Sequence, residues 1–189
     1  MQDFDKTDGT VTSPSSFAHI VLRTACLPKM KDFYTSFLGG RIQHENDFVA
    51  FITYDEEHHR VAILGVPETS AKVPTSCGLE HVAYSFRTLE ELLMAYRQRK
   101  AIGIEPSWCV NHGPTTSIYY KDPDGNMIET QVDNFATIEE ANDFMHGKYF
   151  AENPIGTDFD PEELIQRIKN GEDEETLKKR VEIGPRGLP

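Results

Sequence analysis

The sequence is poor in cysteine and has no long hydrophobic run. Its 189 residues include three cysteines, Cys26, Cys77 and Cys109, too few and too scattered for a disulfide framework or a cysteine-based zinc site. No apolar run approaches the roughly 20 residues that cross a bilayer. Residues 1–16 have neither a basic start nor an apolar centre, so they predict a flexible polar arm rather than a secretory signal. We therefore expect a cytoplasmic protein without membrane contact, with each cysteine a small buried residue.

Positive charge is also scarce. The chain has 19 Lys and Arg against 31 Asp and Glu, a net charge of −12, and acidic residues are dense between Asp158 and Glu182. Such a surface repels phosphate backbones, so the sequence predicts no nucleic-acid partner. Hydrophobic residues make up 38% and charged residues 26%, which is typical of one globular domain or two small fused modules.

The chain repeats itself at an offset of 62 residues. Phe17–Leu22 then aligns with Leu79–Tyr84, and both are strand patterns with a histidine at the third position, His19 and His81. Two amphipathic segments with helical spacing align at the same offset: Leu27–Leu38 and Leu89–Lys100. The sequence therefore predicts two related modules.

Each module continues from its helix into three strand-like segments. They are Arg41–His44, Phe48–Tyr54 and Arg60–Val66 in the first module, and Glu105–Val110, Thr115–Tyr120 and Met127–Val132 in the second. Residues 67–77 read as a linker. We predict an α+β fold in which two tandem βαβββ modules, residues 17–66 and 78–133, form one curved metal-binding sheet within a domain of residues 17–136.

Residues 137–189 predict a helical C-terminal extension. Thr137 and Glu140 form a capping box for a helix that ends near His146, and Asp160 precedes a proline that begins another helix. Residues 183–189 are not expected to form regular structure. This tail either wraps over a partner subunit or is mobile, and both interpretations stay open. A one-domain chain with such a tail predicts a homo-oligomer.

Two histidines and one glutamate form a candidate metal site. The repeat brings His19 and His81 to equivalent places on one concave surface. Glu129 in the last strand adds a carboxylate, which the first module lacks at its counterpart near Val61. Two imidazoles and one carboxylate on one side of an ion leave other positions open, as in the non-haem iron(II) oxygenases. Each residue alone is more often structural, so the prediction depends on their combination.

The segment Tyr120–Glu129 resembles the final strand-turn-strand of the vicinal-oxygen-chelate superfamily, which includes glyoxalases, bleomycin-resistance proteins and type I extradiol dioxygenases. The resemblance covers residues 17–133 and is closest to a one-domain form of the extradiol enzymes. It implies that His19, His81 and Glu129 bind iron(II), with manganese(II) as the alternative metal. It also implies a small aromatic diol and O2 as substrates.

The same resemblance implies three catalytic residues. His59 matches the acid–base histidine of the extradiol enzymes, and strand alternation places it on the same side as Val61. Tyr119 lies ten residues before Glu129, as in the family. His112 lies seven residues before Tyr119, a shorter spacing than in the two-domain enzymes, so its match is the weakest. On the structural interpretation, His59 lies in a solvated turn and Tyr119 in the core.

The predicted function is ring cleavage of a catechol-type diol, with both atoms of O2 inserted at a mononuclear iron(II) site. One alternative is a metal-dependent isomerase, epimerase or thiol transferase of the glyoxalase type. Such an enzyme would share the three ligands but would not need His59 and Tyr119. The other alternative is a non-catalytic protein that binds small molecules, and such proteins usually lack a complete metal triad.

Overall fold

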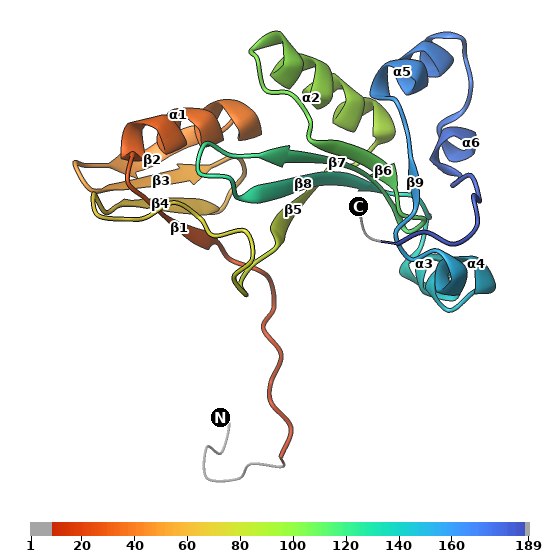
Figure 1. Ribbon diagram of the computed structural model, residues 1–189, viewed down its shortest axis with the longest axis horizontal. Helices are drawn as coiled ribbons and strands as arrows, with labels where there is room; N and C mark the ends of the chain where they lie inside the picture. The colour runs from red at the N-terminus through yellow and green to blue at the C-terminus, as the bar shows by residue number, and fades with distance from the viewer. Residues whose placement is uncertain (1–8, 188–189) are drawn as a thin grey trace.

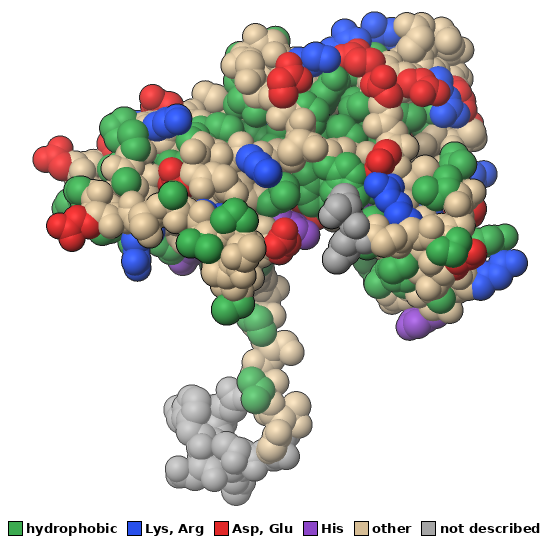
Figure 2. Space-filling view, viewed as in Figure 1, with side chains coloured by type: hydrophobic (Ala, Val, Ile, Leu, Met, Phe, Trp, Pro, Cys, Tyr) green, Lys and Arg blue, Asp and Glu red, His purple; other side chains and the backbone are tan. Residues whose placement is uncertain are grey.

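The computed structural model describes residues 9–187. Residues 1–8 of the expected arm and residues 188–189 of the tail lie outside this part. The described chain folds into two β-sheets, and its two longest helices cover them from the same side (Figure 1). No helix within residues 9–187 is long and apolar enough to cross a membrane. On the face shown in Figure 2, acidic and basic side chains are interspersed rather than gathered in a basic stripe.

The first module has four strands and one helix. These are β1 (Ile20–Thr24), α1 (Leu27–Leu38), β2 (Arg41–Glu45), β3 (Val49–Thr53) and β4 (Val61–Gly65). The strand order is β1-β4-β3-β2, and β1 runs parallel to β4 while the other pairs are antiparallel. Helix α1 ends at Gly39, whose φ of 59° is a left-handed conformation that glycine adopts without strain.

The second module repeats this arrangement. It contains β5 (His81–Ser85), α2 (Leu89–Ala101), β6 (Trp108–Asn111), β7 (Thr115–Lys121) and β8 (Met127–Asp133). The strand order is β5-β8-β7-β6, with β5 parallel to β8. Helix α2 begins where the Thr88 side chain accepts a hydrogen bond from the Glu91 backbone N–H. The predicted pair of βαβββ modules is therefore confirmed.

The two modules form separate sheets, so the prediction of one curved sheet was wrong. Strands β1 and β5 are each an outer strand of their own sheet, and no ladder joins them in the part of the chain that the structure describes. A cavity of about 540 Å³ lies between them, lined by residues of β1, β5 and the linker. Paired strands lie about 4.8 Å apart, a spacing that strand edges on either side of a cavity do not have.

The core lies between the helices and the sheets and joins the modules. Its fully buried members come from both and include Met30, Tyr34, Phe37, Ile52, Val61, Ile63, Leu89, Leu92, Leu93, Ile118, Tyr120 and Ile128. The hydroxyl of Tyr34 donates to Asp122 Oδ2 at 3.0 Å, and Arg99 Nε donates to the Phe37 carbonyl at 2.9 Å. Both hydrogen bonds cross from one module to the other. Cys26 and Cys77 are exposed, contrary to expectation, because they lie outside the strands and helices.

The C-terminal segment contains four helices and one short strand. These are α3 (Ile138–Met145), α4 (Lys148–Glu152), β9 (Thr157–Asp158), α5 (Pro161–Lys169) and α6 (Glu174–Lys178). The capping box of Thr137 and Glu140 is present, as predicted. The sequence did not predict β9, which pairs with β6 and extends the second sheet to five strands.

The tail after α6 lies against its own chain. Figure 1 shows it returning toward β6 and β9 near α3 and α4. Arg180 donates to backbone carbonyls of α4 and of the residue after β6, and Arg186 forms an ion pair with Asp158 in β9. Neither of the two expectations for the tail predicted this packing.

Candidate active site

The sheet faces that point away from α1 and α2 carry the candidate site. Side chains alternate along a strand, and Tyr120 and Ile128 on β7 and β8 belong to the core. Their neighbours Tyr119 and Glu129 therefore lie on the opposite face. The same alternation places His81 there, because Tyr84 of the same strand packs against the core.

His81 and Glu129 are in direct contact. The His81 Nε2 atom lies 3.0 Å from the Glu129 Oε2 atom, and their side chains are 37% and 7% exposed. Two ligands at right angles, each about 2.1 Å from one ion, would lie about 3.0 Å apart. The pair therefore has both the donor atoms and the spacing of two neighbouring metal ligands.

Tyr119 lies opposite Glu129 in the pairing of β7 with β8. On its other side it pairs with Trp108 of β6, and the two rings stack with centroids 5.1 Å apart. Burial, followed by the charge of Glu129, raises the pKa of Tyr119 above its ordinary value. Tyr119 therefore keeps its proton and presents a hydrogen-bond donor beside the carboxylate.

His112 lies just after β6 and binds Tyr119. Its Nε2 atom is 2.9 Å from the Tyr119 hydroxyl, and its Nδ1 atom is 2.5 Å from the carbonyl oxygen of Ile155. A carbonyl only accepts, so the proton is on Nδ1, and Nε2 of the neutral ring accepts from Tyr119. Burial lowers the pKa of His112, which favours this neutral form. The weakest of the sequence matches thus lies within the same cluster as Tyr119.

His19 and His59 lie together on the first module. Their ring centroids are 4.3 Å apart, and His59 also packs edge-to-face on Phe51 at 4.8 Å. Its Nδ1 atom lies 2.6 Å from the Nδ1 atom of His58. Partial burial, and then the charges of His19 and His58, lower the pKa of His59. His59 is therefore a neutral imidazole near pH 7, which is the form that accepts a proton.

The six predicted residues thus form two groups. His81, Glu129, Tyr119 and His112 lie together on the second module. Elsewhere, His19 contacts His59 on the first module. Within residues 9–187, no three His, Cys, Asp or Glu side chains lie close enough together to bind one ion. The structure therefore brings together two of the three predicted ligands and leaves His19 with His59 on the other sheet.

Strand register corrects the expected counterpart of the glutamate. Strands β1 and β4 pair Ile20 with Val61, and the equivalent strands β5 and β8 pair Val82 with Ile128. Since the repeat equates Ile20 with Val82, the residue that occupies the place of the glutamate is Ala62. Val61 is fully buried in the core. It therefore does not share the side of the sheet on which the site lies.

Sequence reasoning missed two contributors to the site. One is the backbone carbonyl of Ile155, and the other is Asp158, whose carboxylate accepts from Trp108 Nε1 at 2.8 Å. The sequence Asn-Pro-Ile-Gly at positions 153–156 indicates a turn. The sequence does not indicate that this turn packs against the end of β6.

Comparison with known proteins places the chain in a family. The family model described as the Glyoxalase/Bleomycin resistance protein/Dioxygenase superfamily matches residues 16–130. Biphenyl-2,3-diol 1,2-dioxygenase 2 of Rhodococcus globerulus is 44% identical over 162 residues, which are 85% of each chain. Biphenyl-2,3-diol 1,2-dioxygenase 3 of the same organism is 45% identical over 173 residues, 90% of this chain and 91% of that one.

A solved structure shares the fold at low identity. It is a glyoxylase/bleomycin resistance protein/dioxygenase domain from Frankia sp. EAN1pec, with a TM-score of 0.55, 15% identity and coverage of 71% of this chain and 100% of that one. The fold, the family match and the two relatives agree with one another. The chain belongs to the glyoxalase/bleomycin resistance protein/dioxygenase superfamily and, within it, to the group of the extradiol dioxygenases.

Proposed function

We propose that this protein cleaves the ring of a catechol-type aromatic diol beside its two hydroxyls, with O2 as the second substrate. The supporting observation is the cluster of His81, Glu129, Tyr119 and His112 in a chain 44–45% identical to two biphenyl-2,3-diol 1,2-dioxygenases. A glyoxalase-type isomerase would need the ligand pair but not the hydrogen bond between Tyr119 and His112. The cluster therefore favours ring cleavage.

The metal is proposed to be iron(II), held by His19, His81 and Glu129, with manganese(II) as the alternative. Imidazole nitrogen and carboxylate oxygen suit both ions. His81 and Glu129 already have the spacing of neighbouring ligands, and His19 holds the equivalent place at the start of the first module. When bound, the ion lowers the pKa of a coordinated diol hydroxyl and activates dioxygen.

The remaining residues are proposed to handle protons and orient the substrate. His59, neutral because its pKa is lowered, accepts a proton from a diol hydroxyl. His112 Nε2 accepts from the Tyr119 hydroxyl and holds it in place. When the diol is bound, this single O–H turns from His112 to donate to the substrate oxygen that becomes anionic. Trp108 packs on the Tyr119 ring and fixes its plane.

The test uses protein purified without oxygen and loaded with iron(II). Catechol, biphenyl-2,3-diol and a hydroquinone are supplied with ¹⁸O₂, and oxygen uptake and product mass are measured. We expect one O2 consumed per diol and both labelled atoms in a yellow ring-opened product. Binding of the diols without oxygen uptake by fully loaded protein would refute the proposal and favour a sequestering protein. Isomerisation of a thiol adduct without oxygen would favour the glyoxalase-type alternative.

We also propose that residues 17–136 form the domain shared with the family, that residues 137–189 are an extension, and that the chain assembles into a homo-oligomer in the cytoplasm. The arrangement of β1 to β8 within residues 20–133 supports the first part. Sedimentation equilibrium of the purified protein tests the assembly, and a single species at the mass of one chain would contradict it.

A further inference from the structure

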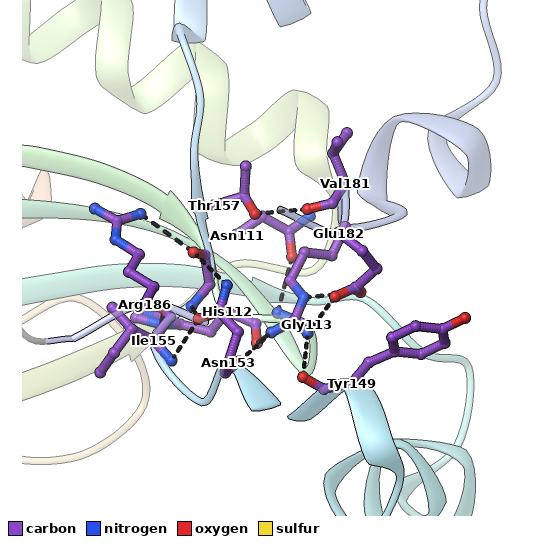
Figure 3. A network of polar contacts seen from close by, with 12 residues as sticks. Asn111, His112, Gly113, Tyr149, Asn153, Ile155, Thr157, Val181, Glu182 and Arg186 are labelled. Carbon is purple, nitrogen blue, oxygen red and sulfur yellow. Dashed lines mark hydrogen bonds and ion pairs between the residues drawn. The ribbon is translucent and has the colours of Figure 1, made fainter. Parts of the chain in front are cut away.

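One arginine of the tail, Arg180, binds the backbone around His112. Figure 3 labels the residues that accept hydrogen bonds from it: His112, Tyr149, Asn153 and Glu182. The side chain of Arg180 is 1% exposed. Its Nη1 atom donates to the carbonyl oxygens of His112 and Asn153 at 3.0 and 2.7 Å, and Nη2 donates to that of Tyr149 at 3.0 Å. Nε and Nη2 also bind the Glu182 carboxylate at 3.0 and 2.8 Å. All five guanidinium N–H groups therefore have an acceptor.

One of the carbonyls that Arg180 binds, that of Asn153, begins a tight turn at residues 153–156. The Asn153 side chain, in a residue only 1% exposed, accepts from the backbone N–H groups of Ile155 and Gly156 at 3.1 and 2.8 Å. Gly156 has a φ of +105°, and a Cβ there would lie 2.2 Å from the last carbonyl oxygen of β6. The turn is thus pressed against the strand end that precedes His112, and a side chain at Gly156 would force it away.

The same turn is held from its other end by Arg186. Its Nη1 atom donates to the Gly156 carbonyl at 3.2 Å, and Nη2 donates to Asp158 Oδ2 at 2.9 Å. Asp158 in turn accepts from Trp108, which stacks on Tyr119. Two arginines of the tail therefore fix the segment that carries the Ile155 carbonyl.

That carbonyl decides which nitrogen of His112 holds the proton. Nδ1 donates to Ile155, so Nε2 is an acceptor for the Tyr119 hydroxyl. If the carbonyl moved away, the proton would be free to move to Nε2. The nitrogen that faces Tyr119 would then be a donor, so it could no longer accept from the hydroxyl, and the hydroxyl would change its orientation.

We propose that Arg180 is a positioning residue for the active site. By binding both the Asn153 carbonyl at the start of the turn and the His112 carbonyl, it keeps the Ile155 carbonyl on Nδ1 of His112 and so fixes the tautomer that orients Tyr119. Arginine is required because a lysine offers three donors from one atom and cannot span carbonyls in a planar fork. The expected effect of Arg180 on turnover rests on the proposed role of His112 in ring cleavage. Its effect on which nitrogen of His112 holds the proton does not depend on that role.

The test reads the tautomer directly in metal-free protein. Histidine-labelled samples of the wild type, Arg180→Met and Arg180→Lys are compared by ¹⁵N NMR, with His112→Phe to assign the signals. Arg167→Met is the matched control, because Arg167 belongs to the same C-terminal segment but binds Glu172. We expect Nδ1–H of His112 in the wild type and the control, and a shift toward Nε2–H in Arg180→Met that Arg180→Lys does not reverse. Unchanged Nδ1–H in a folded Arg180→Met variant would overturn the proposal.

A second variant, Gly156→Ala, displaces the same turn and leaves Arg180 unchanged. Gly156→Ala pushes the turn off β6, so it should shift the His112 tautomer even if Arg180→Met does not fold. With iron loaded, both variants should lose about 10–100-fold in kcat with little change in KM, the usual effect of removing a supporting hydrogen bond. If the tautomer shifts while His112→Phe keeps full activity, the positioning holds and the proposed role of His112 fails. If Gly156→Ala folds with the wild-type tautomer, the positioning fails whatever the activity.

Discussion

The Nε2 atom of His81 lies 3.0 Å from the Oε2 atom of Glu129, although 47 residues separate them in the chain. The parallel pairing of β5 with β8 creates this contact, since it aligns His81 with Met127 two residues before the glutamate. Both side chains point to the face of the sheet that the helices leave uncovered.

Glu129→Gln should weaken iron binding by more than about 100-fold, because removing a partner that only supports a ligand already costs 10–100-fold. The neutral amide keeps the size of the side chain and loses the charge. Iron content after gel filtration measures the effect. Glu80→Gln, the same change at an exposed neighbour of His81, should retain iron, and equal iron in the two variants would argue against Glu129 as a ligand.

His59→Phe should lower kcat by about 10²–10⁴-fold, the usual contribution of a general base, and leave the iron content unchanged. The phenyl ring keeps the packing against Phe51 but cannot accept a proton. Oxygen uptake and metal analysis are measured on the same sample. His146→Phe, at an exposed helix end, serves as control. Normal turnover in His59→Phe would exclude it as the base.

Tyr119→Phe should lower kcat by about 10²–10³-fold, as expected when one donor to a developing anion is removed. The neighbouring Tyr120 points into the core, and its hydroxyl has no hydrogen-bond partner among the described residues. Tyr120→Phe should therefore keep full activity. Steady-state kinetics with a saturating diol distinguish the variants, and equal losses in both would mean that the effect is structural.

Tyr34→Phe should destabilise the protein by about 1 kcal/mol, the usual net value of a buried hydrogen bond. The lost contact with Asp122 Oδ2 joins the two modules. Tyr96 holds the equivalent place in the repeat, and its hydroxyl lies near the surface between Lys100 and Glu162. Tyr96→Phe should cost less. Urea unfolding of the metal-free protein compares the two, and the reverse order would contradict the assignment.

The buried tyrosines should make the protein sensitive to alkali. Burial raises the pKa of Tyr34, Tyr84 and Tyr120 above the ordinary value of about 10. A group whose folded pKa is raised adds stability that is complete below its unfolded pKa and is lost as the pH rises toward the folded pKa. Phenolate absorbance from these residues should therefore appear only together with unfolding. The same titration in guanidinium, where all seven tyrosines are accessible, provides the reference, and early titration in the folded protein would contradict the burial.

Much of this fold was determined by the sequence alone. The 62-residue repeat predicted two βαβββ modules, because strands and helices differ in the spacing of their apolar residues along the sequence. The capping box at Thr137 and Glu140 fixed the start of α3 in the same local way.

Only the tertiary structure decided how these pieces meet. Apolar periodicity does not tell whether the edges of β1 and β5 pair. In the structure they do not, and the chain forms two sheets, with His19 beside His59 instead of His81. Register between distant strands placed Ala62 rather than Val61 at the position of the first module that is equivalent to Glu129. The Ile155 carbonyl, which sets the tautomer of His112, is a backbone group that every residue possesses. Its role arises from long-range packing by the tail, which leaves no pattern in the local sequence.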